Sequence, residues 1–240
     1  MTNHQENKVR IKLEKLQDFA RHQLIDNILP FWREKLPEEE RNGFHGELDH
    51  HGRPVPGASK GLILYARVLY TLSAAFKKTG NPMDLKLADI AFYYLCNHFY
   101  DASHKGFFWT LDARGNPENK KKQIYALAFT IYGLVEYYKT TKDQYALQKA
   151  IETYLVIETR SYDQKQGGYI EAFHEDWSPI EDLRLSEKDL NAVKTMNTHL
   201  HILEAYTRLY SEWRDPKLQE RIADVINIFL FKIIHRNDNY

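Results

Sequence analysis

Three short glycine–aromatic segments recur along the chain at a nearly constant interval. They read NGFHG from Asn42, KGFFW from Lys105 and GGYIE from Gly167. The glycines at 43, 106 and 167 are separated by 63 and 61 residues. A fixed period indicates one structural unit used repeatedly, here about twice as long as the helical repeats of about 33–34 residues. The repeat therefore constrains the architecture more than any other feature of the sequence.

Each unit has the same contents. A charged, amphipathic helix comes first, the glycine–aromatic loop follows with extended or hairpin character, and a helix that is apolar on nearly every side comes last. The charged helices are expected at residues 9–28, 84–99, 144–159 and 217–234. The apolar helices are expected at residues 60–77, 123–138 and 195–212. An amphipathic helix covers a surface, whereas a helix that is apolar all round must be enclosed. The sequence therefore predicts an all-α fold of outer and inner helices, either closed into a toroid or extended as an open solenoid.

The units add up to about three and a half hairpins. Residues 233–240 resemble the lead-in to the second loop at residues 97–101, so a fourth loop is expected just after Asp238. We therefore expect residues 1–240 to be a single incomplete α/α-toroid domain, without an internal boundary, from the front part of a longer protein.

Charge and composition exclude several classes of partner. Lys+Arg and Asp+Glu both number 33, and a zero formal balance argues against binding to nucleic acid or to an anionic membrane. The longest apolar run, residues 61–76, contains Arg67 and is too short to cross a bilayer. The N-terminus lacks the apolar run of a secretory signal, and the single Cys96 cannot form an internal disulfide. We expect a cytoplasmic protein whose partner is a small molecule.

The few polar residues of the apolar helices are the first candidates for a site. Arg67 is the only charge in residues 61–70. Because an unpaired buried guanidinium is costly, Arg67 either bridges to a carboxylate on another helix or faces a wet cavity. Tyr125, on the second apolar helix, is either a core residue or a site residue. The residues alone leave both choices open.

The third apolar helix carries a polar stripe. Asn197, His201, Glu204 and Arg208 are spaced i, i+4, i+7 and i+11, so they share one face, which we expect to line a cavity. An imidazole in this stripe could move protons or hold a sugar hydroxyl, and the alternative is a hydrogen-bonded core histidine. His199 points about 200° away from His201, so the two cannot bind one metal together.

Other motifs either are missing or admit a structural explanation. The chain contains no G-x-G-x-x-G, phosphate-binding Walker-type loop or G-x-S-x-G, and a lone cysteine provides no thiolate metal site. We therefore expect neither a metal nor a cofactor. The loop residues Trp109, Glu171 and Trp177 could stack on or bind a sugar, and packing between adjacent loops is at least as good an explanation.

Five segments of the chain match, in order, the motifs of a known enzyme family. They are FW at 31–32, NGFHG at 42–46, KGLILYAR at 60–67, GYIEAF at 168–173 and KTMNTHLHILEAY at 194–206. Together they resemble the cellobiose 2-epimerases of the N-acylglucosamine 2-epimerase superfamily, from about Leu24 to the C-terminus. The histidine-containing helix is the most specific segment.

The resemblance implies an (α/α)6 barrel and a carbohydrate isomerase. The implied reaction is reversible 2-epimerisation of the reducing-end glucose of cellobiose and related β-1,4-disaccharides to mannose, through a cis-enediolate, without a metal or nucleotide. Arg67 matches the arginine that supports the developing oxyanion, and His201 matches the first of three site histidines. The positions that the resemblance implies to contact the sugar are Tyr125, Asn197 and Asp189. Two further candidates for sugar binding come from the residue patterns above, Glu204 from the polar stripe and Trp109 from the loops. The two other site histidines belong to the family's second half, so residues 1–240 alone are expected to be incomplete for catalysis.

Two alternatives remain. One is another activity of the same superfamily, N-acylglucosamine 2-epimerase or mannose isomerase. The helix that contains Thr-His-Leu-His favours the cellobiose type over both. The other is a non-catalytic helical-repeat scaffold, which would present an open, polar concave face instead of a histidine stripe in a pocket.

Overall fold

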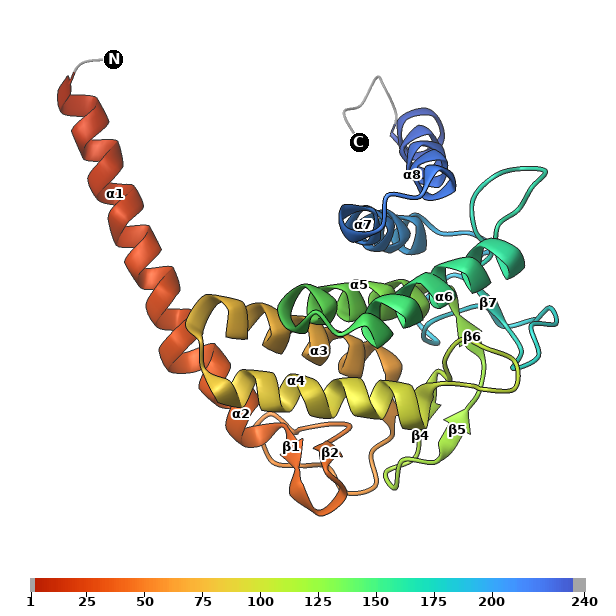
Figure 1. Cartoon of the computed structure of the whole chain (residues 1–240), viewed down its shortest axis with the longest axis horizontal. Helices are drawn as coiled ribbons and strands as arrows, with labels where there is room; N and C mark the ends of the chain where they lie inside the picture. The colour runs from red at the N-terminus through yellow and green to blue at the C-terminus, as the bar shows by residue number, and fades with distance from the viewer. Residues whose placement is uncertain (1–2, 235–240) are drawn as a thin grey trace.

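The computed structural model describes residues 3–234, which form a curved arc of helical hairpins (Figure 1). The inner helices are α3 (Leu62–Thr79), α5 (Ile124–Thr141) and α7 (Met196–Glu212), and α5 packs against both of the others. Each inner helix is followed by an outer one, α4 (Pro82–Tyr94), α6 (Gln144–Arg160) or α8 (Pro216–Ile228). The predicted alternation of outer helix, loop and inner helix is confirmed in the described part of the chain.

The ends of the helices follow from local sequence. Gly80 has a φ of +71° and ends α3, and the Asn81 side chain then accepts a hydrogen bond from the Met83 N–H at 2.9 Å, which caps α4. Asp215 caps α8 in the same way, with 3.0 Å to the Leu218 N–H. A proline occupies the first turn of both outer helices, where its missing N–H costs nothing. Local sequence therefore sets where α3 ends and where α4 and α8 begin.

The first charged helix differs from its expected packing. It comprises α1 (Asn3–His22), the π-helical turn η1 (Gln23–Ile28) and α2 (Leu29–Lys35). Figure 1 shows α1 extending away from the rest of the chain. Its apolar side chains are 55–62% exposed at Val9, Leu13, Leu16 and Phe19. A helix is confirmed at residues 9–28, but the expectation that its apolar face covers a surface is wrong for the residues described.

Similar π-helical turns follow two of the outer helices. They are η3 (Leu95–Phe99) after α4 and η4 (Phe229–Ile233) after α8. Both lie inside the predicted helices 84–99 and 217–234, which are confirmed. The lead-in to a fourth loop predicted at the end of the chain lies largely in residues 235–240, outside the described residues.

Short antiparallel strands join neighbouring units. Strands β1 (Pro37–Glu38) and β2 (Gly43–Phe44) pair within the first loop. The strand before α3, β3 (Lys60–Gly61), pairs with β4 (Thr110–Leu111) of the second loop, which also pairs with β5 (Pro117–Asn119). The strand before α5, β6 (Lys122–Gln123), pairs with β7 (Ala172–Phe173) of the third loop. This pairing explains why α3 and α5 begin one or two residues later than expected.

A lysine stands two residues before each inner helix and closes the loop of its own unit. Lys60 Nζ lies 2.5 Å from Glu38, Lys122 Nζ 2.6 Å from Asp101, and Lys194 Nζ 2.7 Å from Asp163. Lys60 and Lys122 are at most 1% exposed. The three lysines mark equivalent positions in the three units, a register that the spacing of the glycines alone does not reveal.

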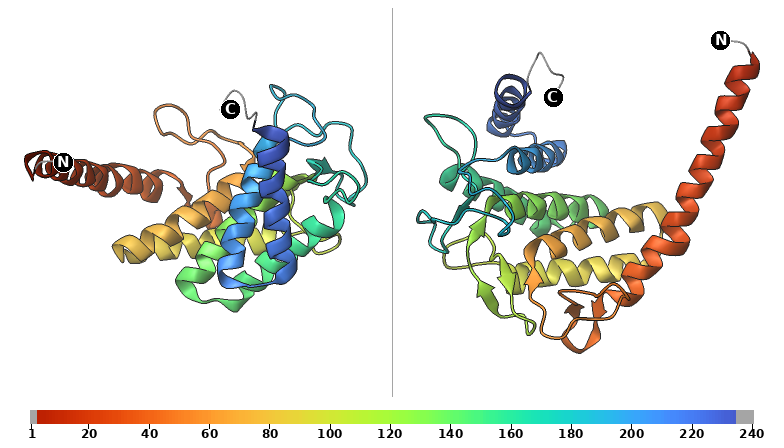
Figure 2. Two further views of the ribbon diagram at one scale, coloured as in Figure 1. Left: turned by 90° about the horizontal axis from the view of Figure 1, so that it is seen from above. Right: turned by 180° about the vertical axis from the view of Figure 1, so that it is seen from behind.

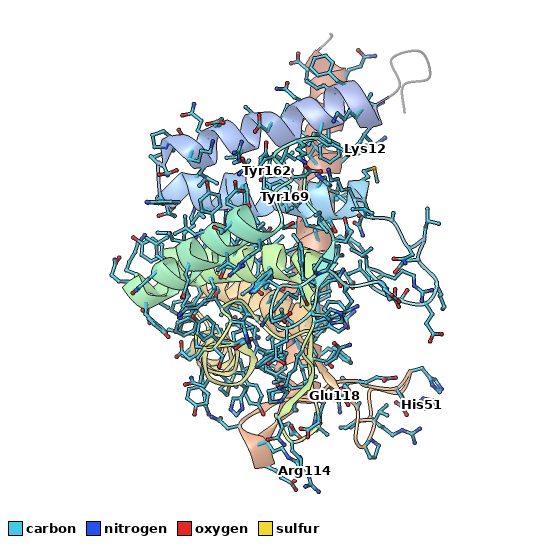
Figure 3. The ribbon with its side chains drawn as sticks, turned by 90° about the vertical axis from the view of Figure 1, so that its right-hand side faces the viewer. Lys12, His51, Arg114, Glu118, Tyr162 and Tyr169 are labelled. Carbon is cyan, nitrogen blue, oxygen red and sulfur yellow. The ribbon has the colours of Figure 1, made fainter. Side chains whose placement is uncertain are left out.

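One hydrophobic cluster connects the units, extending from Leu36 to Val225. Aromatic residues continue it into the loops: Figure 3 shows Tyr162 and Tyr169 together in the third loop, where their ring centroids are 5.4 Å apart. The view from behind shows the same curved arrangement of helices (Figure 2, right). Within residues 3–234, none of the helices has the length and hydropathy of a membrane span.

Candidate active site

Equivalent positions of the three inner helices line one cavity of about 620 Å³. Arg67 on α3, Phe129 on α5 and His201 on α7 are each the seventh residue after the loop lysine of their unit. All three line the cavity, together with Trp32 from α2. The volume is typical of a small-molecule site. Three different side chains at one repeated position therefore give the cavity a cation, an aromatic ring and an imidazole.

A second row lies one turn further along the same helices. Tyr70, Tyr132 and Glu204 are each the tenth residue after the loop lysine, and all three line the cavity. The rings of Tyr70 and Tyr132 stack with centroids 4.1 Å apart. Burial, together with the contact to Tyr70, raises the pKa of Tyr132, so its phenol stays protonated. This row adds two neutral hydroxyls and one carboxylate to the cavity.

His201 is fixed on several sides. Its Nδ1 lies 2.6 Å from the Glu204 carboxylate, and its ring lies 4.8 Å from that of Tyr125, edge to face. Because a carboxylate can only accept, Nδ1 carries a proton, and in the tautomer with this single proton Nε2 is an acceptor. The His201 side chain is 15% exposed. It is therefore placed to exchange a proton with, or bind a hydroxyl of, a molecule in the cavity.

Arg67 faces the cavity. Its guanidinium carbon lies 4.7 Å above the centre of the Phe129 ring, and none of the carboxylates in the described residues forms an ion pair with it. The residue is exposed, so the starting assumption of a buried guanidinium is wrong. Of the two explanations left open by the sequence, the structure agrees with the wet cavity and not with a bridge between helices.

The ends of the predicted stripe leave this cavity. Arg208 forms an ion pair with the buried Glu136 of α5, which also accepts from Lys77 Nζ at 3.2 Å. Asn197, at the other end, lines a second cavity of about 330 Å³ together with Asp189. The stripe thus contributes His201 and Glu204 to the first cavity and Asn197 to the second.

The predicted loop residues are placed less centrally. Asp189 accepts from the N–H and Oγ of Ser186, both at 2.8 Å, which shapes the loop before α7. Trp109 lines neither of the two cavities; its carbonyl accepts from the Leu62 N–H at 3.1 Å, and Lys121 Nζ lies 5.2 Å from its ring centre. Tyr125 does not line the first cavity, but its ring contacts those of His201 and Phe129, which do.

Two other loop residues have structural roles. Glu171 is buried and accepts from the Thr195 N–H at 2.7 Å and from the Thr198 hydroxyl at 2.5 Å, which holds the start of α7. Burial raises the pKa of its carboxyl group. Trp177 donates from Nε1 to the His104 carbonyl at 2.8 Å. For both, the explanation by loop packing agrees with the structure.

His199 is the core histidine of α7. It is 3% exposed, its Nδ1 donates to the Thr195 carbonyl at 2.7 Å, and its Nε2 accepts from the Tyr169 N–H at 3.0 Å. Burial lowers its pKa, which keeps the ring neutral. Both nitrogens of His199 therefore form hydrogen bonds. By contrast, Nε2 of His201 has no hydrogen-bond partner among residues 3–234.

One group of possible metal ligands lies apart from the cavity. Asp101, His104 and Glu175 place one ligand atom each within 4.8 Å of the others. The buried Lys122 already forms an ion pair with the Asp101 carboxylate, so the positive charge beside this carboxylate is that of the lysine side chain. None of the three residues lines the first cavity.

Several lining residues were not predicted from the sequence. Trp32 enters the sequence analysis only through the FW motif at 31–32, and Tyr70, Phe129 and Tyr132 are three of the 32 aromatic residues of the chain, with no role predicted for them. The register set by the loop lysines would have found the last three, because Phe129 is equivalent to Arg67 and His201, and the two tyrosines are equivalent to Glu204.

Comparison with known proteins gives a consistent result. The sequence profile of the N-acylglucosamine 2-epimerase (GlcNAc 2-epimerase) family matches residues 43–240. The cellobiose 2-epimerase of Bacteroides fragilis is 43% identical over 95% of this chain and 58% of its own length. That of Dictyoglomus turgidum is 37% identical over 90% of this chain and 55% of its own length. The chain thus spans little more than half the length of these relatives.

Solved structures agree with the sequence comparison. The cellobiose 2-epimerase of Spirochaeta thermophila superposes with a TM-score of 0.88 at 40% identity, over 94% of this chain and 56% of that one. The predicted all-α barrel of helical hairpins is thereby confirmed, with the present chain spanning little more than half of that structure.

Proposed function

The chain belongs to the N-acylglucosamine 2-epimerase family, and on this premise we propose that the full-length protein is a cellobiose 2-epimerase. It interconverts the glucose and mannose forms of the reducing-end sugar of cellobiose and related β-1,4-linked disaccharides. The observation that carries the proposal is the placement of Arg67 and His201, from different units, at equivalent positions of one cavity.

The chemistry requires a proton acceptor and a stabilised oxyanion. After the sugar ring opens, a base removes the proton from C2, the electron pair of that C–H bond forms the C1–C2 double bond, and the carbonyl oxygen becomes an oxyanion. Arg67, whose guanidinium has no carboxylate partner among the described residues, stabilises this cis-enediolate. Return of a proton to the opposite face of C2 gives the epimer, with no net oxidation.

His201 serves the same step through Nε2. The Glu204 carboxylate holds the proton on Nδ1, so Nε2 accepts a hydrogen bond from a sugar hydroxyl or takes up a proton. The two site histidines that the family resemblance assigns to acid–base exchange at C2 lie beyond this chain. Residues 1–240 therefore form part of one toroid domain and supply part of the catalytic machinery.

The second cavity provides a place for the other sugar unit. Asn197 and His201 are one turn apart on α7, so the two cavities are neighbours along that helix. Asn197 and Asp189 would contact the sugar beyond the reacting one, and Tyr125 and Glu204 would border the reacting sugar. We assign the enzyme to the cytoplasm, consistent with its single cysteine.

Turnover measurements distinguish the candidate activities. The full-length protein is assayed with cellobiose, mannose and N-acetylglucosamine, and we expect C2 epimerisation of cellobiose with the highest kcat/KM. Preference for mannose would instead indicate a mannose isomerase, and preference for N-acetylglucosamine an N-acylglucosamine 2-epimerase. A non-catalytic scaffold is disfavoured because the first cavity is lined mainly by apolar and aromatic residues.

A further inference from the structure

Phe129 stands between the two residues proposed to act on the sugar. Its ring centre is 4.7 Å from the guanidinium carbon of Arg67 and 4.4 Å from the ring centre of His201. It is 7% exposed, and it comes from α5, the middle of the three inner helices. Because its position is equivalent to those of Arg67 and His201, a side chain here borders both neighbours.

Arg67 contacts the face of an aromatic ring and not a carboxylate. A cation over an aromatic face is attracted by the ring quadrupole, and the ring offers no oxygen atom to the N–H groups. A carboxylate partner would instead occupy those N–H groups in a bidentate pair. Glu204 lines the same cavity but is bound to His201, and none of the carboxylates in the described residues pairs with Arg67.

The contact with His201 helps to fix the imidazole plane. Phe129 packs on the ring at an interplanar angle of 40°, and Tyr125 meets it edge to face at 83°. Glu204 holds Nδ1 from a third direction. Removal of Phe129 would leave space on one side of the imidazole and beneath the guanidinium at once.

We propose that Phe129 is a positioning residue that holds the Arg67 guanidinium and the His201 imidazole in place on the two sides of its ring. The inference rests on the proposed function, because it presumes that Arg67 and His201 act on one sugar. It predicts that Phe129 influences catalysis through Arg67, without touching the reacting atoms.

Two substitutions in the full-length protein test the role of the ring. Phe129→Leu keeps an apolar side chain but removes the ring, and we expect kcat for cellobiose to fall on the order of tenfold to a hundredfold, with a smaller change in KM. Phe129→Tyr keeps the ring and should retain most of kcat. The matched control is Phe108→Leu, which alters an aromatic side chain that is 8% exposed and lies outside the cavity, and which should leave kcat unchanged. A Phe129→Leu enzyme with wild-type kcat would overturn the proposal.

A double-mutant cycle separates positioning from general loss of structure. If Phe129 acts through Arg67, adding Phe129→Leu to Arg67→Lys should lower kcat much less than Phe129→Leu does alone, whereas additive effects would contradict the proposal. A crystal structure of the Phe129→Leu protein checks it without turnover: the guanidinium should leave its wild-type position over residue 129, and an unmoved Arg67 would overturn it. If the wild-type protein epimerises no sugar, the proposed function fails, and this structure still decides the role of Phe129.

Discussion

The Nδ1 atom of His201 lies 2.6 Å from the Glu204 carboxylate, three residues further along the same helix. Residues three apart on a helix lie on one face, so this contact forms within α7 and does not depend on the neighbouring helices. It fixes which imidazole nitrogen carries the proton and leaves Nε2 for the substrate. α7 thus supplies the cavity with a hydrogen-bond acceptor, Nε2 of His201, whose tautomer is set by Glu204 of the same helix.

Replacing either member of this pair should impair catalysis to different degrees. His201→Ala should lower kcat at least about a hundredfold, the lower end of the contribution of a positioned proton-transfer group. Glu204→Gln keeps an oxygen acceptor for Nδ1 but loses the charge, so its kcat should fall less. The measurement is kcat for cellobiose in the full-length protein, with thermal unfolding as the control for folding. Equal activity of His201→Ala and wild type would show that α7 presents a different face to the substrate.

Arg67→Lys should preserve the fold and remove most activity. Lysine keeps the positive charge but loses the planar group that can donate to two oxygens. We expect a loss of about 2–4 kcal/mol in transition-state stabilisation, the size of one oxyanion donor, measured as the ratio of kcat/KM values. Unchanged kcat/KM together with a lowered unfolding temperature would make Arg67 a structural residue.

The sequence predicted the helices well because their signals are local. The cap Asn81 and the proline after it start α4, and the nearly continuous apolar character of residues 123–138 indicates α5, which is buried on nearly every side. The site was harder, because which residues share a cavity depends on how the units pack. Arg67 and His201 were identified as polar exceptions on apolar helices, whereas Phe129 carries no such signal.

The long-range contacts explain what the sequence did not reveal. Arg208 shares a helical face with His201, yet the carboxylate of Glu136, 72 residues away in the chain, draws it into an ion pair. Glu171 was a candidate sugar ligand, but it is used to cap α7. Arg208 takes its role from a partner in another unit, and Glu171 takes its role from a partner 24 residues further along its own unit, and one sequence does not disclose either partner.

His199 should make the protein less stable in mild acid. Burial keeps its folded-state pKa below the usual 6.5, so as the pH falls below about 6.5 the unfolded state takes up the proton first and stability decreases. His199→Leu, which copies the equivalent Leu127, should flatten this dependence. It should also lower stability by about 1–3 kcal/mol, because the Tyr169 N–H loses its acceptor.

Urea unfolding between pH 7 and pH 5 measures this effect. The Lys194 hydrogen bond lowers the pKa of Asp163 to about 2, so the contribution of Asp163 is lost only between about pH 4 and pH 2 and does not overlap with that of His199. An unchanged slope in His199→Leu would assign the acid sensitivity to other groups.

The buried pair of Lys122 and Asp101 should be essential for the second loop. Lys122→Met leaves the Asp101 charge buried without its cation, and we expect a loss of about 3–5 kcal/mol in unfolding free energy, measured with urea. Adding Asp101→Asn should recover part of this loss, because no charge then remains buried and the amide oxygen can still accept from the Ser103 N–H. The matched control is Lys217→Met, from an exposed pair with Glu220, which should change stability by about 0.5 kcal/mol or less. Similar small losses in both variants would mean that the strands, and not the lysines, hold the loops to the inner helices.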